Sequence, residues 1–146
     1  LVAYYEELVK KYNILYLEDG LSEDDVEGWK YLTEKLGQNC VVTGDDLTAT
    51  NPERLQMALN TKLLTGIIIK PNQIGTVMES IAVVAMAKAA GLKVIVSHRS
   101  GETNDDFIAD FGVAVSADYV KFGAPARGER VAKYNRLLKI EQELKQ

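Results

Sequence analysis

Short apolar runs rich in β-branched residues alternate along the chain with longer segments in which apolar residues recur at helical spacing. Five of the runs stop at an ionisable side chain, at Glu18, Asp45, Lys70, His98 and Lys121. Successive stops differ by 27, 25, 28 and 23 positions, which is close to the roughly 30 residues of one strand-helix unit. The pattern predicts an α/β fold of parallel (βα) units whose strand ends gather on one face.

The segments between these runs predict helices with recognisable ends. Ser22, Asn51, Thr76 and Asn104 each precede a helical pattern and can accept hydrogen bonds from its first backbone N–H groups. Glu79 completes a capping box with Thr76. The predicted strands cover residues 14–17, 41–44, 67–69, 94–97 and 119–120, and the predicted helices cover residues 1–12, 23–36, 52–60, 77–90, 105–115 and 129–145.

Length and composition narrow the picture. The 146 residues suffice for one domain with a core, but an eight-stranded α/β barrel takes roughly 250, so we expect a partial barrel. A net charge of −4 without a dense basic block argues against nucleic-acid binding. The longest apolar stretch, residues 81–90, is interrupted by Lys88 and is too short to span a membrane. The only cysteine, Cys40, is expected to be a small buried side chain, and with no signal-peptide pattern we expect a cytoplasmic protein.

Two carboxylates at neighbouring strand ends are candidates for a metal site. Glu18 and Asp45 are hard oxygen ligands, and two such groups on one face suit Mg²⁺. The alternative is that each carboxylate caps the helix that follows it. Asp19 and Asp46 come next in the chain, and we expect them to orient the ligands or to cap.

Two lysines end strands on the same face. Lys70 and Lys121 could pair with Glu18 or Asp45 in ordinary salt bridges. Alternatively, two lysines close to a divalent cation would weaken each other's hold on a proton. A lysine kept partly neutral in this way can act as a general base.

The run that ends at residues 98–100 predicts an anion site. Arg99 offers a planar fork suited to phosphate or carboxylate, Ser100 adds a hydroxyl, and Gly101 lets the backbone approach a ligand closely. His98 could be a core histidine satisfied by a neighbour, or it could contact a ligand together with Arg99 and Ser100.

At these positions the sequence closely resembles the enolase family, and the matching segments follow family order along nearly the whole chain. They are residues 17–21 (LEDGL), 44–47 (GDDL) with 50–51 (TN), 69–76 (IKPNQIGT), 97–103 (SHRSGET), 121–127 (KFGAPAR), 129–130 (ER) and 132–135 (AKYN). The resemblance implies the last five strands of an enolase-type TIM barrel. It also implies reversible Mg²⁺-dependent dehydration of 2-phosphoglycerate to phosphoenolpyruvate, a glycolytic lyase reaction (phosphopyruvate hydratase).

The resemblance assigns a role to each candidate. Glu18 and Asp45 would be two of three carboxylate ligands of Mg²⁺, Lys70 would take the proton from C2 of the substrate, and Lys121 would neutralise the substrate carboxylate. A lysine or histidine base with one or two Mg²⁺ ions is the known chemistry of the enolase superfamily. His98 would contact the substrate, while Arg99 and Ser100 would hold its phosphate.

Several family features have no counterpart in these 146 residues: the N-terminal domain, the first barrel strands, the third metal carboxylate and a pair of glutamates linked to loss of the 3-hydroxyl. We therefore predict that the complete protein is an enolase and that this chain alone is inactive. The alternative is a non-catalytic half-barrel that self-associates through its uncovered edges, and we expect a homo-oligomer. Another enolase-superfamily enzyme is disfavoured by the phosphate-type contacts of residues 97–103.

Overall fold

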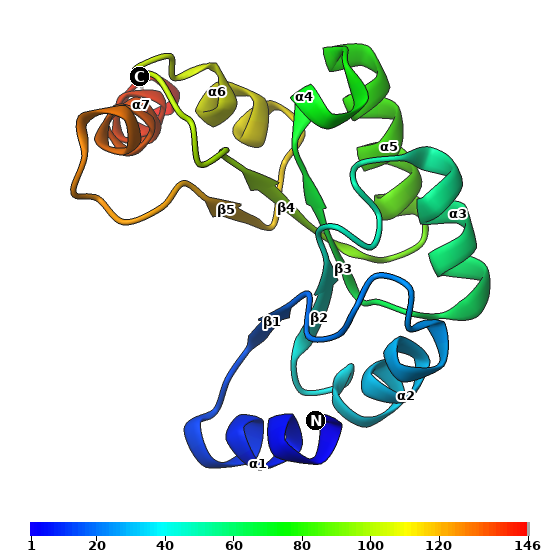
Figure 1. The fold of residues 1–146 in the computed structure, drawn as a ribbon. Helices are drawn as coiled ribbons and strands as arrows, with labels where there is room; N and C mark the ends of the chain where they lie inside the picture. Colours follow the sequence, from blue (N-terminus) through cyan, green and yellow to red (C-terminus); the bar gives the residue numbers. More distant parts are fainter. Residues whose placement is uncertain (146) are drawn as a thin grey trace. The chain divides into compact units, whose positions relative to one another are not determined.

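The computed structural model describes residues 1–145, which form alternating strands and helices (Figure 1). The strands are β1 (Tyr16–Glu18), β2 (Val41–Gly44), β3 (Gly66–Ile69), β4 (Lys93–Ser97) and β5 (Tyr119–Lys121). The helices are α1 (Val2–Tyr12), α2 (Val26–Leu36), α3 (Pro52–Thr61), α4 (Pro71–Ile74), α5 (Val77–Ala89), α6 (Phe107–Ala114) and α7 (Gly128–Leu144).

The strands follow one another in the sheet in the order β1-β2-β3-β4-β5. β1 pairs with β2, β2 with β3 and β4 with β5, all in parallel, and Ser97 of β4 lies opposite Lys121 of β5. Parallel neighbours in chain order, each pair joined through a helix, are the topology of part of an α/β barrel. The predicted fold class is confirmed. The chain divides into two compact units, residues 1–94 and 95–146, and β4 begins in the first and continues in the second.

The first unit is built on a strand buried on both faces. Ile67, Ile68 and Ile69 of β3 are completely buried, as expected for a parallel strand covered on both sides. Trp29 of α2 and Leu55 of α3 are also fully buried, and Figure 1 shows α2, α3 and α5 ranged along one side of β2 and β3. Burying apolar surface at roughly 25 cal/mol per Å² is what holds these helices on the strands. The expectation for Cys40 is confirmed, because its side chain is buried and its thiol pKa is raised by that burial.

The start of α2 differs from the prediction, and the starts of α3 and α5 agree with it. Asp25, not Ser22, caps α2, since its carboxylate accepts a hydrogen bond from the Gly28 N–H at 2.9 Å. The Ser22 carbonyl instead accepts the indole N–H of Trp29, which ties the preceding turn to the core. Asn51 caps α3, and Thr76 forms the predicted capping box with Glu79 at the start of α5. The sequence patterns at these two starts leave a single strong acceptor at the capping position.

The second unit packs α6 and α7 together. Arg136 of α7 donates hydrogen bonds to both carboxylate oxygens of Asp110 of α6, with N···O distances of 2.6 and 2.9 Å. This contact lowers the pKa of Asp110. The predicted cap Asn104 is wrong, because the N-cap residue of α6 is Asp106, whose side chain makes no capping bond, and Asp105 accepts the Phe107 N–H. None of the helices within residues 1–145 has both the length and the apolar character that a membrane crossing requires.

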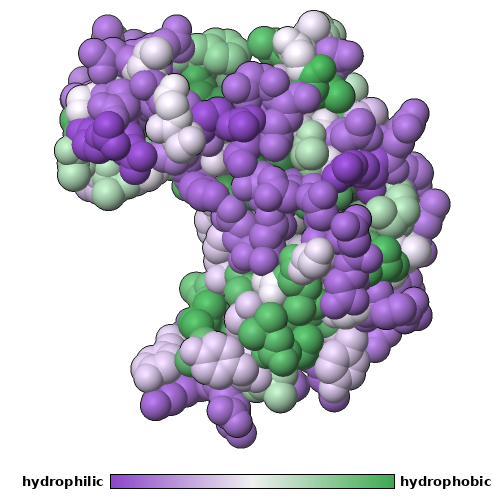
Figure 2. All heavy atoms as spheres, in the orientation of Figure 1, coloured by the Kyte–Doolittle hydropathy of each residue, from purple (hydrophilic) through white to green (hydrophobic). Residues whose placement is uncertain are grey.

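The outer strands expose apolar side chains. In the first unit Leu15, just before β1, is 66% exposed, and Figure 2 shows hydrophobic surface around β1 and α1. In the second unit Tyr119 and Val120 of β5 are 50% and 38% exposed. β1 and β5 end the strand order, so each has a side on which no further described strand is paired. Such edges favour pairing with another strand.

Candidate active site

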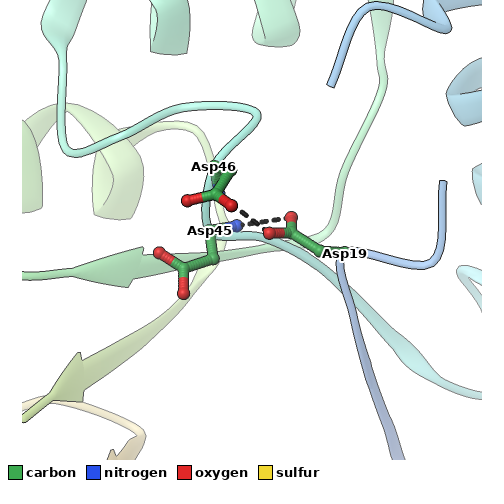
Figure 3. Close-up of side chains that lie close together, drawn as sticks. All are labelled: Asp19, Asp45 and Asp46. Atoms are coloured by element: carbon green, nitrogen blue, oxygen red, sulfur yellow. Dashed lines mark hydrogen bonds between the residues drawn. The ribbon is translucent and has the colours of Figure 1, made fainter. Parts of the chain in front are cut away.

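Carboxylates gather at the ends of β1 and β2. Asp19, Asp45 and Asp46 each place one oxygen within 4.8 Å of the others (Figure 3). Asp19 accepts the backbone N–H groups of Asp45 at 2.8 Å and Asp46 at 2.9 Å, whereas the carboxylate of Asp45 is directed away from it. Asp19 therefore holds the turn that presents Asp45. Burial raises the pKa of Asp19, against the lowering effect of these two hydrogen bonds.

Lys70 binds the buried carboxylate of Asp45. Its Nζ lies 2.7 Å from Oδ1 and 2.5 Å from Oδ2 of Asp45, and the two side chains are only 12% and 9% exposed. Lys70 thus forms an ion pair with Asp45, which leaves its role as a base a prediction. The capping alternative for the carboxylates is wrong, because α2 is capped by Asp25 and α3 by Asn51. Asp45 holds a positive charge at the end of its strand, which a capping residue would not do.

Two residues that sequence reasoning missed orient Lys70. The Thr50 hydroxyl accepts the backbone N–H of Lys70 at 3.0 Å and donates to Oε1 of Gln73 at 2.8 Å. Thr50 is fully buried and has a positive φ of 53°, as Ala49 has at 46°, a backbone conformation that L residues adopt at a cost. The only signal in the sequence was that Thr50 and Gln73 fall inside the family-like segments. Nothing in their local sequence distinguishes them from ordinary turn residues.

The carboxylates of Glu18 and Asp45 both act on the hydroxyl of Tyr16. The Tyr16 hydroxyl donates to Oε2 of Glu18 at 2.8 Å. Burial raises the pKa of Tyr16 well above its ordinary value, and the hydrogen bond and charge of Glu18, together with the charge of Asp45, raise it further. The ends of β1 and β2 therefore concentrate negative charge, which favours a cation.

In the second unit, two predicted residues meet at neighbouring strand ends. The backbone N–H of His98 donates to the carbonyl of Lys121 at 2.9 Å, extending the β4–β5 pairing beyond Ser97. Arg99 and Ser100 follow in an exposed turn. The backbone N–H of Arg99 is bound at 2.7 Å by Oε1 of Glu102. His98, Arg99, Ser100 and Lys121 thus lie at the ends of one strand pair, as predicted.

The imidazole of His98 is only partly satisfied. Its Nδ1 is buried and accepts or donates no hydrogen bond within residues 1–145. Burial lowers the pKa of His98 below its ordinary value, and the charge of Arg130 lowers it further, while Glu102 and the Phe122 backbone oppose this. A neutral imidazole with an open nitrogen agrees with the ligand-contact alternative better than with a fully satisfied core histidine.

Acidification is expected to destabilise the protein through His98. Because the folded state lowers its pKa, the unfolded chain binds the proton more readily. The stabilisation is present above the unfolded pKa and is lost as pH falls towards the folded value. We expect the free energy of unfolding to fall as the pH is lowered from about 7.5 through the ordinary histidine pKa of about 6.5, and this slope to be smaller in His98→Gln. Urea titrations across this range measure it, and equal slopes would contradict the assignment. His98 is the only histidine of the chain, which makes the comparison direct.

Gly123 leaves room for the His98 ring. It has a φ of +79°, and a Cβ there would lie 2.6 Å from Cε1 of His98 and 2.7 Å from Cδ of Arg130. Gly123→Ala is expected to lower the free energy of unfolding by about 2 to 3 kcal/mol, from the backbone conformation and the overlap together. Gly101→Ala is the matched control, because a Cβ at Gly101 meets nothing within 4 Å. Chemical denaturation of both variants checks this, and similar losses would contradict it.

Known proteins resemble this sequence over nearly its whole length. The family model described as "Enolase, C-terminal TIM barrel domain" matches residues 1–146. The chain belongs to the enolase family. It is 54% identical over 145 residues to an enolase of Helicobacter pylori (strain HPAG1), covering 99% of this chain and 34% of that protein. It is also 54% identical over 144 residues to an enolase of Helicobacter hepaticus, with the same coverage. This enolase-family chain thus spans about a third of the length of the curated relatives it matches.

Family membership agrees with where the charged groups lie. In α/β barrels the carboxyl ends of the strands carry the chemistry, while the opposite face serves stability. The enolase chain also has a hollow of about 420 Å³ beside α1 and the end of α2, lined in part by Asn13 and Asn39. These residues precede β1 and β2, so the hollow lies at the amino ends of the strands. The candidate residues therefore lie at carboxyl ends of strands: Glu18, Asp45 and Lys70 in the first unit, and His98, Arg99, Ser100 and Lys121 in the second.

Carboxylate oxygens that could hold a divalent cation lie at the ends of β1 and β2 of the enolase chain. Asp45 is a buried carboxylate that already binds a positive charge, the Lys70 ammonium. Glu18 adds a second carboxylate, and the charges of Glu18 and Asp45 both raise the pKa of Tyr16. Hard oxygen ligands of this kind, with room for water or substrate oxygens, are the ones Mg²⁺ prefers.

Proposed function

We propose that the complete protein interconverts 2-phosphoglycerate and phosphoenolpyruvate, and that this chain supplies the C-terminal part of its barrel domain. The supporting observation is that chemically active side chains lie at the strand ends of both units: Glu18, Asp45 and Lys70 in the first, and His98, Arg99, Ser100 and Lys121 in the second. In the forward reaction the C2–H bond breaks, the C2=C3 bond forms and the C3 hydroxyl leaves as water. A cytoplasmic location is part of the proposal, because the reaction belongs to glycolysis.

Lys70 is proposed as the base that takes the proton from C2. Its backbone is fixed by Thr50 and its Nζ by Asp45, which supports a defined position for the amine. Positioned proton transfer of this kind contributes about 10²- to 10⁴-fold to a rate. Glu18 and Asp45 are proposed to hold Mg²⁺, which when bound supplies charge that stabilises a developing enolate.

The β4–β5 ends are proposed to bind the anionic groups of the substrate. Arg99 and Ser100 would hold the phosphate, which suits an exposed turn with a planar guanidinium and a hydroxyl. Lys121 would neutralise the carboxylate, and His98 would contact the substrate. Positive groups preplaced around a site where negative charge develops are the largest single contribution in many enzymes.

The proposed function is tested with the complete enzyme and 2-phosphoglycerate. Phosphoenolpyruvate formation is followed by its ultraviolet absorbance, with Mg²⁺ and with excess chelator, and the unphosphorylated hydroxy acid serves as competing substrate. Mg²⁺-dependent turnover of the phosphorylated acid alone would support the proposal. Equal use of both acids would favour a different reaction, and no turnover would overturn it. The isolated 146-residue chain should be inactive in the same assay, and measurable dehydration by it would contradict that prediction.

A second candidate function is a non-catalytic half-barrel that self-associates. The exposed Leu15 beside β1, and Tyr119 and Val120 on β5, favour it, because uncovered apolar strand edges tend to pair. The isolated chain is therefore expected to sediment as a dimer or larger species, with the fraction rising with concentration. Sedimentation velocity measures this, and a compact monomer at all concentrations would contradict it.

A further inference from the structure

Lys133 of α7 is a completely buried lysine, and all three of its protons are used. Its Nζ donates to the carbonyls of Thr103 and Glu129 at 2.7 Å each and lies 2.6 Å from Oε2 of Glu102. Its side chain is 0% exposed, whereas that of Glu102 is 17% exposed. An ammonium has three donors, so these three acceptors satisfy the buried Lys133 Nζ completely. Glu129 belongs to α7 itself, while Thr103 and Glu102 belong to the loop after β4.

Glu102 links Lys133 to the main chain at Arg99. One oxygen of its carboxylate binds Lys133, and the other accepts the backbone N–H of Arg99 at 2.7 Å. Burial would raise the pKa of Glu102, but the bonds from Lys133 and from the Arg99 backbone outweigh it and lower the pKa. Glu102 therefore stays charged at neutral pH and keeps both bonds.

Packing does not hold the turn between these residues. Ser100 and Gly101 are exposed, and a Cβ at Gly101 would meet nothing within 4 Å. The contacts described above, from Lys133 through Glu102 to Arg99, hold the loop on both sides of this turn. A buried charge is costly, and an apolar side chain of similar size is often at least as stable. A buried lysine at this position therefore needs an explanation other than core stability.

We propose that Lys133 is a positioning residue for the anion-binding loop. Through Glu102 it fixes the main chain at Arg99, so that the guanidinium of Arg99 and the hydroxyl of Ser100 are held ready for a phosphoryl group. The proposal rests on the proposed function, which makes the phosphate of 2-phosphoglycerate the ligand of this loop. Misplacement of a binding group by about 1 Å can cost about a hundredfold.

The test compares Lys133→Met, Glu102→Gln and their double variant in the complete enzyme. Each single variant is expected to raise the KM for 2-phosphoglycerate and the inhibition constant of inorganic phosphate about ten- to a hundredfold, with a smaller change in kcat. The backbone N–H of Arg99 should exchange with deuterium faster. Because both residues act through one chain of contacts, the double variant should resemble the more severe single variant. Glu102→Gln keeps the proposal testable if Lys133→Met does not fold.

Lys139→Met is the matched control, because Lys139 lies on the same helix but is exposed. It should leave both constants and the Arg99 exchange unchanged. Unchanged phosphate inhibition in Lys133→Met, or additive losses in the double variant, would overturn the proposal. A wild-type enzyme that does not convert 2-phosphoglycerate would overturn the proposed function alone. Phosphate binding and Arg99 exchange would then still decide whether Lys133 positions the loop.

Discussion

Lys70→Arg is expected to lower kcat of the complete enzyme by about 10²- to 10⁴-fold while keeping the positive charge beside Asp45. The guanidinium can still pair with the carboxylate that now binds Nζ at 2.5 and 2.7 Å. It cannot give up its proton at any ordinary pH, however, so it cannot act as a base. The substitution therefore separates the two alternatives that the sequence left open for Lys70, a salt bridge and a base.

Exchange of the C2 proton of 2-phosphoglycerate with deuterated solvent is the deciding measurement, because it reports proton removal apart from loss of the hydroxyl. We expect the exchange to slow as much as kcat in Lys70→Arg. Lys70→Met removes base and charge together and should be at least as slow. Lys30→Met, at an exposed position of α2, is the control and should exchange at the wild-type rate. Wild-type exchange in Lys70→Arg, with or without a fall in kcat, would mean that another group removes the proton.

The fold was predictable largely because its three central strands, β2 to β4, are almost entirely buried. A parallel strand covered by helices reads as a continuous apolar run, and β3 with its three fully buried isoleucines is the clearest case. The short helix α4 was not predicted, because four residues carry no periodicity. The starts of α2 and α6 were misplaced for a related reason. Ser22 and Asp25, or Asn104 and Asp105, are equally good acceptors, and the choice between them is made by tertiary contacts such as that of Trp29 with Ser22.

The site was predictable as far as it lies at strand ends. A charged residue that closes an apolar run must sit where the strand leaves the sheet, and this placed Asp45, Lys70 and His98. The pairing of Lys70 with Asp45 could be predicted only as an alternative. The sequences of β2 and β3 do not determine how close the side chains at their ends come to each other. Lys133 falls in the family-like segment 132–135, but no role was predicted for it, for a different reason. It stands in a helical pattern rich in charged residues, where one lysine looks like any other, and only the structure buries it.

Asp45→Asn is expected to remove the response of the enzyme to Mg²⁺ and to lower its stability when no Mg²⁺ is added. A ligand that binds only the folded state stabilises it by about 2.7 kcal/mol at a hundred times its dissociation constant, and this gain should be largely lost when a carboxylate ligand becomes an amide. Without Mg²⁺, the variant leaves the largely buried ammonium of Lys70 without its partner. Removing one member of a buried pair costs about 3 kcal/mol or more, so the free energy of unfolding should fall even in chelator.

The two effects can be told apart with Asp46→Asn. Asp46 is exposed, its oxygen lies within 4.8 Å of those of Asp19 and Asp45, and its backbone N–H is held by Asp19. Chemical denaturation of both variants, with Mg²⁺ and with chelator, gives four free energies of unfolding. Asp46→Asn should keep most of the Mg²⁺ stabilisation, since its carboxylate is expected only to support the site. Equal Mg²⁺ stabilisation of Asp45→Asn and the wild type would show that Asp45 is no ligand, and its ion pair with Lys70 would then be a purely structural one.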